Sequence, residues 1–588
     1  MVVDLKASLV DLLRRALAMV APGAEDASIA LERPKSAAHG DYATNLALQL
    51  ARPLKKRPRD IAHLLVAELP RSELIERAEV AGAGFINVFL TRHATRQVVR
   101  QVLEQREAYG RGALGPHRKL IVEFVSANPT GPLHVGHGRG AAYGASLANV
   151  LDFAGFDVTR EFYINDAGRQ MDILALSTWL RYLGCCGEEV PFPPNAYQGD
   201  YVRGMASRIA DSHGDRFVRK ARKVLEDVPP LPDAKRDDAE ARAQREAHLD
   251  ALIAGAKRLL GDDYPYVLQF ALTEQLGDCR DDLAEFGVHF DAWFSERSLF
   301  DTGMVERAVA MLEKHGHVYA QDGALWFRST AFGDEKDRVV RRENGLYTYF
   351  ASDIAYHLNK YDRGFDRMID VWGADHHGYI PRLKGAMRAL GLDADKLDVA
   401  LVQFAVLYRD GQKTSMSTRA GEFVTLRELR NEVGNDAARF FYVLRKSDQH
   451  LDFDLDLAKS QSSDNPVYYV QYAHARVCSV LAQWGGDAAS LLPASDLSPL
   501  TNERELALCR LVSAFPEAVE EAARDCAPHA IAFYLKELAA QFHSYYNAER
   551  ILVDEERLCG ARLSLVVAVR QVLANGLKLL GVAAPESM

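Results

Sequence analysis

The stretch from Lys119 to Asp157 constrains this chain more than any other, because it combines a strand, a turn and a helix around two histidines. It opens with an apolar, β-branched run, 120–125, which predicts a buried strand. A turn rich in Gly and Pro follows, and His134 then opens an alanine-rich helical pattern that ends near Gly155. Unpaired backbone N–H groups and the helix dipole make such a unit a binding place for phosphate.

Two histidines at the start of the helix, His134 and His137, strengthen the phosphate prediction. Residues three apart lie on one helix face, so both imidazoles are expected to face the same ligand. Gly136 between them leaves room for a ligand to approach the backbone. An isolated HxGH pattern is weak evidence, since histidines are common on helix surfaces, but the complete stretch is rarely met by chance.

The composition limits the class of protein. At 588 residues the chain is long enough for several domains, and 48% hydrophobic and 26% charged residues are ordinary globular values. The seven cysteines form no CxxC pair, which predicts a reducing compartment with neither structural disulfides nor zinc. The N-terminus lacks a signal-peptide core, and no uncharged run reaches the length of a membrane span. We therefore expect a cytoplasmic protein without a membrane partner.

The net charge of −10 does not exclude a nucleic-acid partner, because such binding depends on local basic patches. Two candidate patches are present, one at Lys55–Arg59 and one between Arg216 and Lys223. Such patches are more commonly solvated helix faces, and both interpretations stay open.

The chain divides into four predicted parts. Residues 1–110 are predicted to form a small α/β domain, and 115–385 a parallel-sheet domain with an insertion at about 184–262. A connecting region, 386–461, precedes a nearly all-helical segment, 462–588. Five tyrosines of that segment are able to stack on unpaired bases, although aromatics at helical spacing are more often core: Tyr468, Tyr469, Tyr472, Tyr545 and Tyr546.

A second apolar strand, predicted in DRMIDVWGADHHGY, carries Gly373, His376 and His377 at its carboxyl end. Ligands of open α/β sheets bind at the carboxyl ends of strands. We therefore expect this end to face the His134 turn. The alternative is that the two histidines merely terminate a strand.

A loop of another kind lies between Tyr408 and Leu426. It is rich in glycine, serine and threonine, and it contains Lys413 and Arg419. A cationic loop of hydroxyls and amides suits a triphosphate whose leaving group develops negative charge. The sequence has no GxxxxGK[ST] or HExxH pattern and no distinct Ser/His/Asp arrangement, which argues against a P-loop, a zinc protease or a serine hydrolase.

Taken together, HVGH and SMSTRAG resemble the two signatures of class I aminoacyl-tRNA synthetases, usually written HIGH and KMSKS. The residues around them resemble the arginyl-tRNA synthetase family in particular, nearly from end to end. The matching segments are EFVSANPTGPLHVGHGRGA, YINDAGRQ, YQGDY, TYFASDIAYH, WGADHHGY, DFDLDLA, NPVYYVQYAHAR and LGVAAPESM, with HGDYATNLAL and GFINVFL near the N-terminus. The resemblance implies an α/β fold: a Rossmann-like parallel-sheet catalytic domain, an N-terminal α/β tRNA-contacting domain and a C-terminal all-α anticodon-binding bundle.

The resemblance also implies an activity. Arginine and Mg-ATP form arginyl-adenylate and pyrophosphate, and the arginyl group then passes to the terminal adenosine of tRNA(Arg). In this family the first step generally requires bound tRNA. The implied substrates are L-arginine, ATP with Mg²⁺ and tRNA(Arg), with no dedicated protein metal site, and the family is mostly monomeric. Positioning and charge neutralisation, rather than acid–base catalysis, promote attack on the α-phosphorus.

The family pattern, carried over residue by residue, implies the site residues. The implied catalytic residues are His134, His137, Lys413 and Arg419. Those implied to bind ATP are Pro129, Gly131, His134, Gly136, His137, Gly373, His376, Met416 and Ser417. Those implied to bind arginine are Glu123, Asn128, His137, Tyr349 and Asp353. Carboxylates suit arginine because a planar guanidinium with five donors is best met by bidentate acceptors.

The second signature departs from the family pattern. Aligned on Met416 and Ser417, Ser415 and Thr418 occupy the places of the two KMSKS lysines. Some arginyl enzymes carry a compensating lysine just before the first signature, but 126–133 contains none. Positive charge for the pyrophosphate is then expected from one of three residues: Lys413, Arg419 or Arg139.

Three alternatives stay open at this stage. Two share the fold: a synthetase for another amino acid and a small nucleotidylyltransferase with HxGH. A small transferase does not need the helical C-terminus, and another amino acid does not explain the paired carboxylates. The third is a non-catalytic tRNA-binding relative, which the altered second signature favours and the intact His134, His137, Glu123 and Asp353 oppose.

Overall fold

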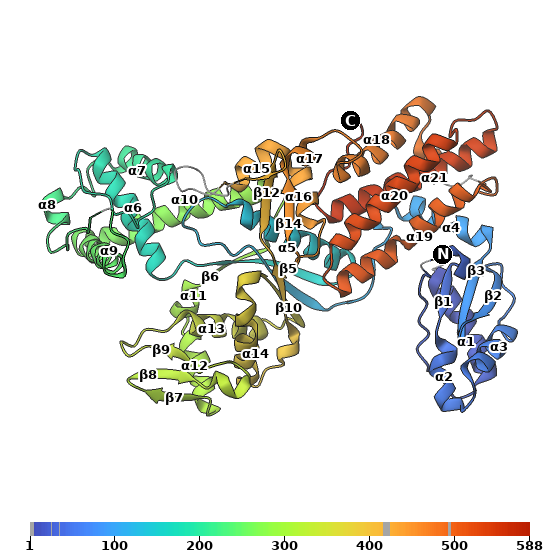
Figure 1. Ribbon diagram of the computed structural model, residues 1–588, viewed down its shortest axis with the longest axis horizontal. Helices are drawn as coiled ribbons and strands as arrows, with labels where there is room; N and C mark the ends of the chain where they lie inside the picture. Colours follow the sequence, from blue (N-terminus) through green and yellow to red (C-terminus); the bar gives the residue numbers. More distant parts are fainter. Residues whose placement is uncertain (1–4, 25, 35, 234, 415–423, 492–495) are drawn as a thin grey trace.

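A five-stranded parallel sheet lies at the centre of the molecule (Figure 1). The computed structural model describes residues 5–588 except 25, 35, 234, 415–423 and 492–495. The strand order is β11-β10-β4-β5-β6, an open sheet with β4 in the middle. Its strands are β4 (Lys119–Glu123), β5 (Asp157–Ile164), β6 (Ala292–Ser295), β10 (Arg367–Gly373) and β11 (Leu397–Val402).

Side chains of the central strand alternate between two hydrophobic cores. Leu120 and Val122 pack with α5 (Val135–Phe153), whereas Ile121 packs on the other face. That second face is covered by α12 (Met304–Lys314), α13 (Tyr349–Asp362) and α14 (Ile380–Ala389). Burial on both faces is what an apolar β-branched run in a parallel sheet predicts.

The helix that follows the central strand, α5, is buried along nearly its whole length. A Cβ on Gly144 would lie 2.3 Å from Phe124 Cγ, and one on Gly138 would lie 2.8 Å from Tyr442 Oη. The small residues of α5 therefore allow close approach to the sheet on one side and to α16 (Asn435–Val443) on the other. This packing fixes His134, which precedes the helix, relative to the sheet.

A helical lobe lies between β5 and β6, at one end of the molecule (Figure 1). It has its own hydrophobic core and consists of α6 (Arg169–Cys185), α7 (Asp200–His213), α8 (Ala221–Val224), α9 (Ala239–Leu260) and α10 (Tyr264–Glu285). The predicted insertion ends at about 262, but α10 packs against α6 and extends the lobe to 285. The sequence of α10 shows no break in composition at its end, so its membership of the lobe depends on a tertiary contact.

A second lobe lies between β6 and α13. It contains α11 (Arg297–Asp301), α12 and an antiparallel sheet of β7 (Val318–Gln321), β8 (Ala324–Phe327) and β9 (Arg338–Arg341). The chain then returns through α13, β10 and α14 to β11. The predicted domain end at 385 falls inside α14, and the five-stranded sheet continues with β11.

The remainder of the predicted connecting region forms a small three-stranded sheet with three short helices. The strands are β12 (Ala405–Arg409), β13 (Gln412–Lys413) and β14 (Leu451–Asp454). The helices are α15 (Leu426–Val433), α16 and α17 (Leu455–Lys459). The strand β12 joins β13 in an antiparallel hairpin and β14 in a parallel pair.

The N-terminal domain has a three-stranded antiparallel sheet of β1 (Tyr42–Thr44), β3 (Phe85–Leu90) and β2 (Ile75–Ala81), in that order. Its helices are α1 (Leu5–Val20), α2 (Leu46–Leu54) and α3 (Pro58–Ala67). The next helix, α4 (Arg92–Gln105), lies within the predicted domain 1–110 but packs against helices of the C-terminal bundle. Arg33 donates to Glu517 at 2.8 Å and ties the domain to the same bundle.

Four long helices form the C-terminal bundle: α18 (Pro466–Trp484), α19 (Glu503–Arg524), α20 (His529–Ala548) and α21 (Glu556–Leu579). Within the described residues, α21 alone is long and apolar enough to cross a membrane, with a mean hydropathy of 1.3 over its most apolar window. That window is 67% buried, and α21 contacts α4, α18, α19 and α20. It is the core helix of the bundle.

The end of the chain returns to the domain of the parallel sheet, and the C-terminus lies near α17 and α18 (Figure 1). The buried Arg439 donates to the backbone oxygens of Leu580 at 3.0 Å and Phe286 at 2.9 Å. Asn149 on α5 donates to Leu579 O at 3.2 Å. The last turn of α21 and the residues after it therefore support α5 and α16 from behind.

Candidate active site

The two histidines of the first signature cap α5 reciprocally. Gly136 N donates to His134 Nδ1 at 3.1 Å, and His134 N donates to His137 Nδ1 at 3.3 Å. Their rings stack with centroids 3.6 Å apart. Both imidazoles therefore lie on one side of the helix N-terminus, with the backbone donors of the first turn.

Both histidines are neutral at physiological pH. Burial lowers the pKa of His134, and burial together with the adjacent His134 lowers the pKa of His137 to about 3. Because Nδ1 of each ring accepts a backbone N–H, the proton of the neutral ring is on Nε2. Each Nε2–H is then a donor of the kind that binds phosphate oxygens.

The residues on either side of His134 are hydrogen-bonded to the residues that follow the second signature. Leu426 N donates to Leu133 O at 2.8 Å, and Val135 N donates to Val424 O at 3.0 Å. On the N-terminal side of the second signature, Lys413 on β13 is exposed. Met416, Ser417 and Arg419 lie outside the described residues, as do Ser415 and Thr418.

Arg139 is not a source of charge for a ligand, contrary to one of the three alternatives from the sequence. Its guanidinium is 1% exposed. It donates to three backbone oxygens, those of Gln403 at 2.7 Å, Gln449 at 2.8 Å and Lys446 at 2.9 Å. Burial lowers its pKa to about 10, so the group stays charged and joins α5 to the chain around β12.

Gly136 is required by the histidine pair itself. A Cβ at this position would lie 2.8 Å from His134 Cε1 and 3.6 Å from Phe404 Cδ1. Phe404 follows β11, is 48% exposed and was not singled out from the sequence. An exposed aromatic ring beside the histidine-capped turn has the right chemistry to stack on a nucleobase. The signal was available, since an aromatic side chain stands two residues after a strand end.

The loop between β4 and α5 contacts the helical lobe. Tyr201 on α7 donates to Thr130 O, and a Cβ on Gly131 would lie 3.3 Å from the same hydroxyl. Pro129 is buried and Asn128 is exposed. The glycine therefore admits Tyr201, and the lobe helps to hold the loop that presents Asn128.

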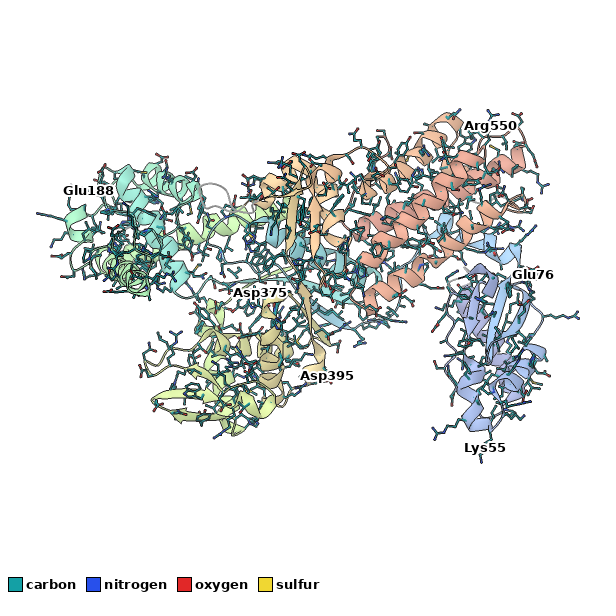
Figure 2. The ribbon with its side chains drawn as sticks, in the orientation of Figure 1. Lys55, Glu76, Glu188, Asp375, Asp395 and Arg550 are labelled. Carbon is teal, nitrogen blue, oxygen red and sulfur yellow. The ribbon has the colours of Figure 1, made fainter. Side chains whose placement is uncertain are left out.

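The predicted strand end at Gly373 lies at the same edge of the sheet. Gly373 ends β10 and pairs with Val402 on β11, two residues before Phe404. His376 is exposed on the short helical segment that follows and lies 3.5 Å from Asp375. Asp375 lies in the middle of the molecule, above the second lobe (Figure 2).

The predicted arginine-binding residues of α13 occupy its first two turns. Tyr349 is the first residue of the helix and is 62% exposed, whereas Asp353 is half-buried. Asp353 accepts a hydrogen bond from the Tyr379 hydroxyl. Burial raises the pKa of Asp353, and the Tyr379 hydrogen bond opposes this rise. A half-buried carboxylate with one neutral partner is a favourable acceptor for a cationic ligand.

Glu123, the other predicted arginine-binding carboxylate, is already hydrogen-bonded on both oxygens. Oε1 accepts from Ser126 Oγ and Oε2 accepts from Lys360 Nζ, each at 2.8 Å. A carboxylate has about four acceptor positions, so two contacts leave capacity for a ligand.

A third buried carboxyl group, Glu296, was missed from the sequence. It follows β6 and accepts from Ser352 Oγ at 2.9 Å, next to Asp353 on α13. Burial, followed by the nearby charges of Asp353 and Asp166, raises its pKa to about 7. The four-residue strand AWFS carries no clear periodicity, so nothing marked Glu296 as the residue at a strand end.

The two basic patches predicted from the sequence differ in their surroundings. In the second patch Arg216 pairs with Asp263 at 2.8 Å and Lys220 pairs with Glu188 at 2.7 Å, so much of its charge is neutralised. The first patch lies at the outer tip of the N-terminal domain, where Figure 2 labels Lys55. Of the five tyrosines, Tyr545 is core, and the others are half-buried.

The described residues contain no group of three or more His, Cys, Asp or Glu side chains placed to hold a metal ion. The seven cysteines, all within the described ranges, are free.

Three protein families match the chain in succession. Residues 6–90 match the arginyl tRNA synthetase N terminal domain, 98–182 and 280–452 match the class I (R) tRNA synthetase catalytic domain, and 470–588 match the DALR anticodon binding domain. Arginine–tRNA ligases of Azoarcus sp. strain BH72 and of Aromatoleum aromaticum are each 72% identical over 586 residues, with 100% of both chains covered.

Solved structures agree with these matches. A putative arginyl-tRNA synthetase from Campylobacter jejuni is 32% identical with a TM-score of 0.73, covering 85% of this chain and 100% of its own. The arginyl-tRNA synthetase of Thermus thermophilus is 26% identical with the same TM-score, covering 99% of this chain and 100% of its own. The predicted fold class is thereby confirmed, and this chain belongs to the arginyl-tRNA synthetase family.

Proposed function

We propose that this chain is an arginine–tRNA ligase in which one turn, 123–137, separates the amino-acid site from the nucleotide site. The observation that carries the proposal is an enclosed group of carboxylates directly before a neutral histidine cap. Glu123 and Glu296 are buried, Asp353 is half-buried, and Lys360 is the cation that contacts Glu123 within the described residues. A ligand that combines a positive charge with several N–H donors suits this excess of negative charge.

On the arginine side, Asp353 and Glu296 accept from the guanidinium, and Tyr349 lies over the entrance of the pocket. Glu123 and Asn128 are placed nearer the reacting end of the amino acid, at the start of the turn, with His137 beyond them. These roles combine the family pattern with the burial and the hydrogen bonds described above.

On the nucleotide side, His134 and His137 donate from Nε2 to phosphate oxygens of Mg-ATP. Phe404 stacks on the adenine, and Gly373 and His376 lie beside the adenosine. The remaining nucleotide contacts expected from the family pattern are Pro129, Gly131, Gly136, Met416 and Ser417.

The first reaction is attack of an arginine carboxylate oxygen on the α-phosphorus, with pyrophosphate as the leaving group. Neutral donors and the helix N-terminus stabilise negative charge on the phosphates without any proton transfer. Lys413 and Arg419 flank the second signature and supply the positive charge that its two missing lysines would provide.

The second reaction transfers the arginyl group to the terminal adenosine of tRNA(Arg). The half-buried Tyr468, Tyr472 and Tyr546 suit base stacking on the bundle, because Arg476 lies over the rings of the last two at 4.4 and 4.8 Å. Lys55 and Lys56 at the tip of the N-terminal domain suit a second contact with the tRNA backbone. We also propose that the chain acts as a monomer in the cytoplasm.

The test is arginine-dependent charging of tRNA, with cysteine, glutamate and glutamine as control amino acids. Charging with arginine alone supports the proposal. Charging with another amino acid would point to a same-fold synthetase of different specificity. Binding of tRNA without any charging would point to a non-catalytic relative.

A further inference from the structure

A buried lysine, Lys360, joins the two strands that end at the proposed substrate sites. Its side chain is fully buried beneath α13. Nζ donates to Glu123 Oε2 at 2.8 Å and to Asp370 Oδ1 at 2.6 Å. Glu123 ends β4, and Asp370 is its register partner on β10. One ammonium group therefore bridges two adjacent carboxylates in the middle of the sheet.

From Asp370 on β10, the hydrogen bonds continue to α13, the helix that contains Asp353. His357 is bonded through Nε2 to Asp370 Oδ2 and through Nδ1 to the backbone oxygen of Asp353, each at 2.7 Å. Asp353, His357 and Lys360 follow one another at helical spacing, so they share one face of α13. Lys360 thereby fixes Glu123 relative to the turn of helix that carries Asp353.

On the side of β4, the hydrogen bonds continue into a strained turn. Ser126 Oγ donates to Glu123 Oε1 at 2.8 Å, and the same Ser126 Oγ accepts from Tyr163 N at 3.2 Å. Val125 and Ser126 have φ values of 68° and 43°, a left-handed conformation that is costly for a β-branched residue. The bond from Glu123 to Ser126 helps to hold this conformation, from which the chain leads on to Asn128.

The charged and titratable groups around Glu123 come from three elements. Lys360, His357 and Tyr356 face it from α13, Asp370 from β10 and Tyr163 from β5. Burial raises the pKa of Glu123, and the charge of Lys360 is the strongest opposing influence. Burial alone would lower the pKa of Lys360, but Asp370 and Glu123 raise it. Lys360 is therefore the group that favours an ionised Glu123.

Stability alone does not explain such a network, since buried ion pairs are often no more stabilising than apolar side chains of similar volume. We propose that Lys360 is a positioning residue that sets the affinity for arginine without touching it, by holding Glu123 charged and the turn at Val125–Ser126 in place. The inference rests on the proposed function, because it assigns Glu123 to the amino-acid site.

A double-mutant cycle tests this role. Charging of tRNA is measured at varied arginine and at varied ATP for the wild type, Lys360→Met, Glu123→Gln and the double variant. In Lys360→Met the KM for arginine should rise on the order of tenfold or more, the loss expected when one charged hydrogen-bond acceptor is lost. The KM for ATP should change much less. In the Glu123→Gln background Lys360→Met should have little further effect, because its action passes through Glu123.

Two further variants separate positioning from general stability. Lys360→Arg keeps the charge and should recover much of the arginine affinity. Arg363→Met, at the residue that follows the same helix, removes the ion pair with Glu161 at 2.6 Å and should lower the melting temperature with the KM for arginine unchanged.

Each outcome decides the inference. An unchanged KM for arginine in soluble Lys360→Met, or effects of Lys360→Met and Glu123→Gln that simply multiply, would overturn it while leaving the proposed function intact. If Lys360→Met does not fold, the comparison is made between Glu123→Gln and the double variant, in which Glu123 no longer leaves a buried charge and Asp370 keeps His357 as its partner. A wild-type chain that charges no arginine would overturn both proposals together.

Discussion

The two ends of the turn between β4 and α5 differ in the charge of the ligand that they favour. At its start, buried carboxylates outnumber the cations near them, and burial raises the pKa of Glu123, Asp353 and Glu296. At its end, two imidazoles are kept neutral, and burial lowers both of their pKa values. Burial disfavours charge at both ends. A cationic ligand relieves the first end, whereas an anionic ligand meets only donors at the second, so one short segment can separate two substrates of opposite charge.

The largest effect is expected from the nucleotide end. His134→Ala removes one Nε2–H donor and should lower kcat by about 10²–10³, the usual loss for one preorganised donor to a charged transition state. The KM for arginine should change little, because the carboxylates at the other end are untouched. Steady-state charging kinetics at varied ATP and arginine measure both effects.

His134→Asn is the matched control for the same site, because an asparagine oxygen also caps a helix N-terminus. It should recover the melting temperature lost in His134→Ala, where loss of the cap costs about 1 kcal/mol, but not the full kcat. Equal activity of His134→Asn and wild type would show that the cap, and not the Nε2 donor, is what matters.

The amino-acid end is probed by Asp353→Asn. The change removes a charge but keeps the shape and a hydrogen-bond acceptor for Tyr379, so the fold should survive. The KM for arginine should rise by about 10²-fold, corresponding to the loss of a charged hydrogen bond. Asp362→Asn is the control on the same helix, since Asp362 pairs with Arg307 at the surface. An unchanged KM for arginine in Asp353→Asn would remove Asp353 from the pocket.

The charge missing from the second signature is located by separate Lys413→Ala and Arg419→Ala variants. Loss of the compensating cation should slow adenylate formation on the order of 30-fold, about 2 kcal/mol, in single-turnover measurements with tRNA present. Gln412→Ala, on the same short strand as Lys413, is the control. Full activity in both basic variants would place the compensating charge elsewhere.

The smallest effect is a pH dependence. With its pKa raised to about 7, Glu296 gains its charge between pH 6 and 8, so the KM for arginine should fall by up to about tenfold over that interval. Glu296→Gln should flatten the profile. The effect of Glu296 on the stability of the fold has the opposite sign. Because its pKa is raised in the folded state, Glu296 favours folding below its unfolded pKa, and this contribution is lost as the pH rises through about 7. A wild-type KM for arginine independent of pH would exclude Glu296 from the pocket.

The sequence was most informative where local rules and function coincide. The buried strand, the turn and the capped helix of 119–153 follow from apolar, β-branched and breaker residues in a fixed order, and the structure confirms them. The same rules predicted the strand that ends at Gly373. They failed for β6, which is too short to show a period, and therefore also for Glu296.

Long-range contacts account for the other differences. Lys360 and Glu123 are 237 residues apart, and no local pattern reveals that an ordinary helical lysine neutralises a strand-end carboxylate. Arg139 is basic and stands two residues after the first signature, which suggested a ligand contact, but its position on α5 directs it toward backbone oxygens of Gln403 and Lys446. The sequence predicted that Gly136 leaves room for a ligand. In the structure, a side chain at this position would already collide with the His134 ring.

The return of the chain end to the catalytic domain has a consequence for biosynthesis. Arg439 and Asn149, which brace the helix behind the histidine cap, find partners at Leu580 and Leu579. Both partners come after all five strands of the parallel sheet in the sequence. A nascent chain can therefore form its sheet early, but it completes the support of α5 only once the end of α21 has been made. A chain interrupted before α21 would have the sheet and the histidine cap without this support.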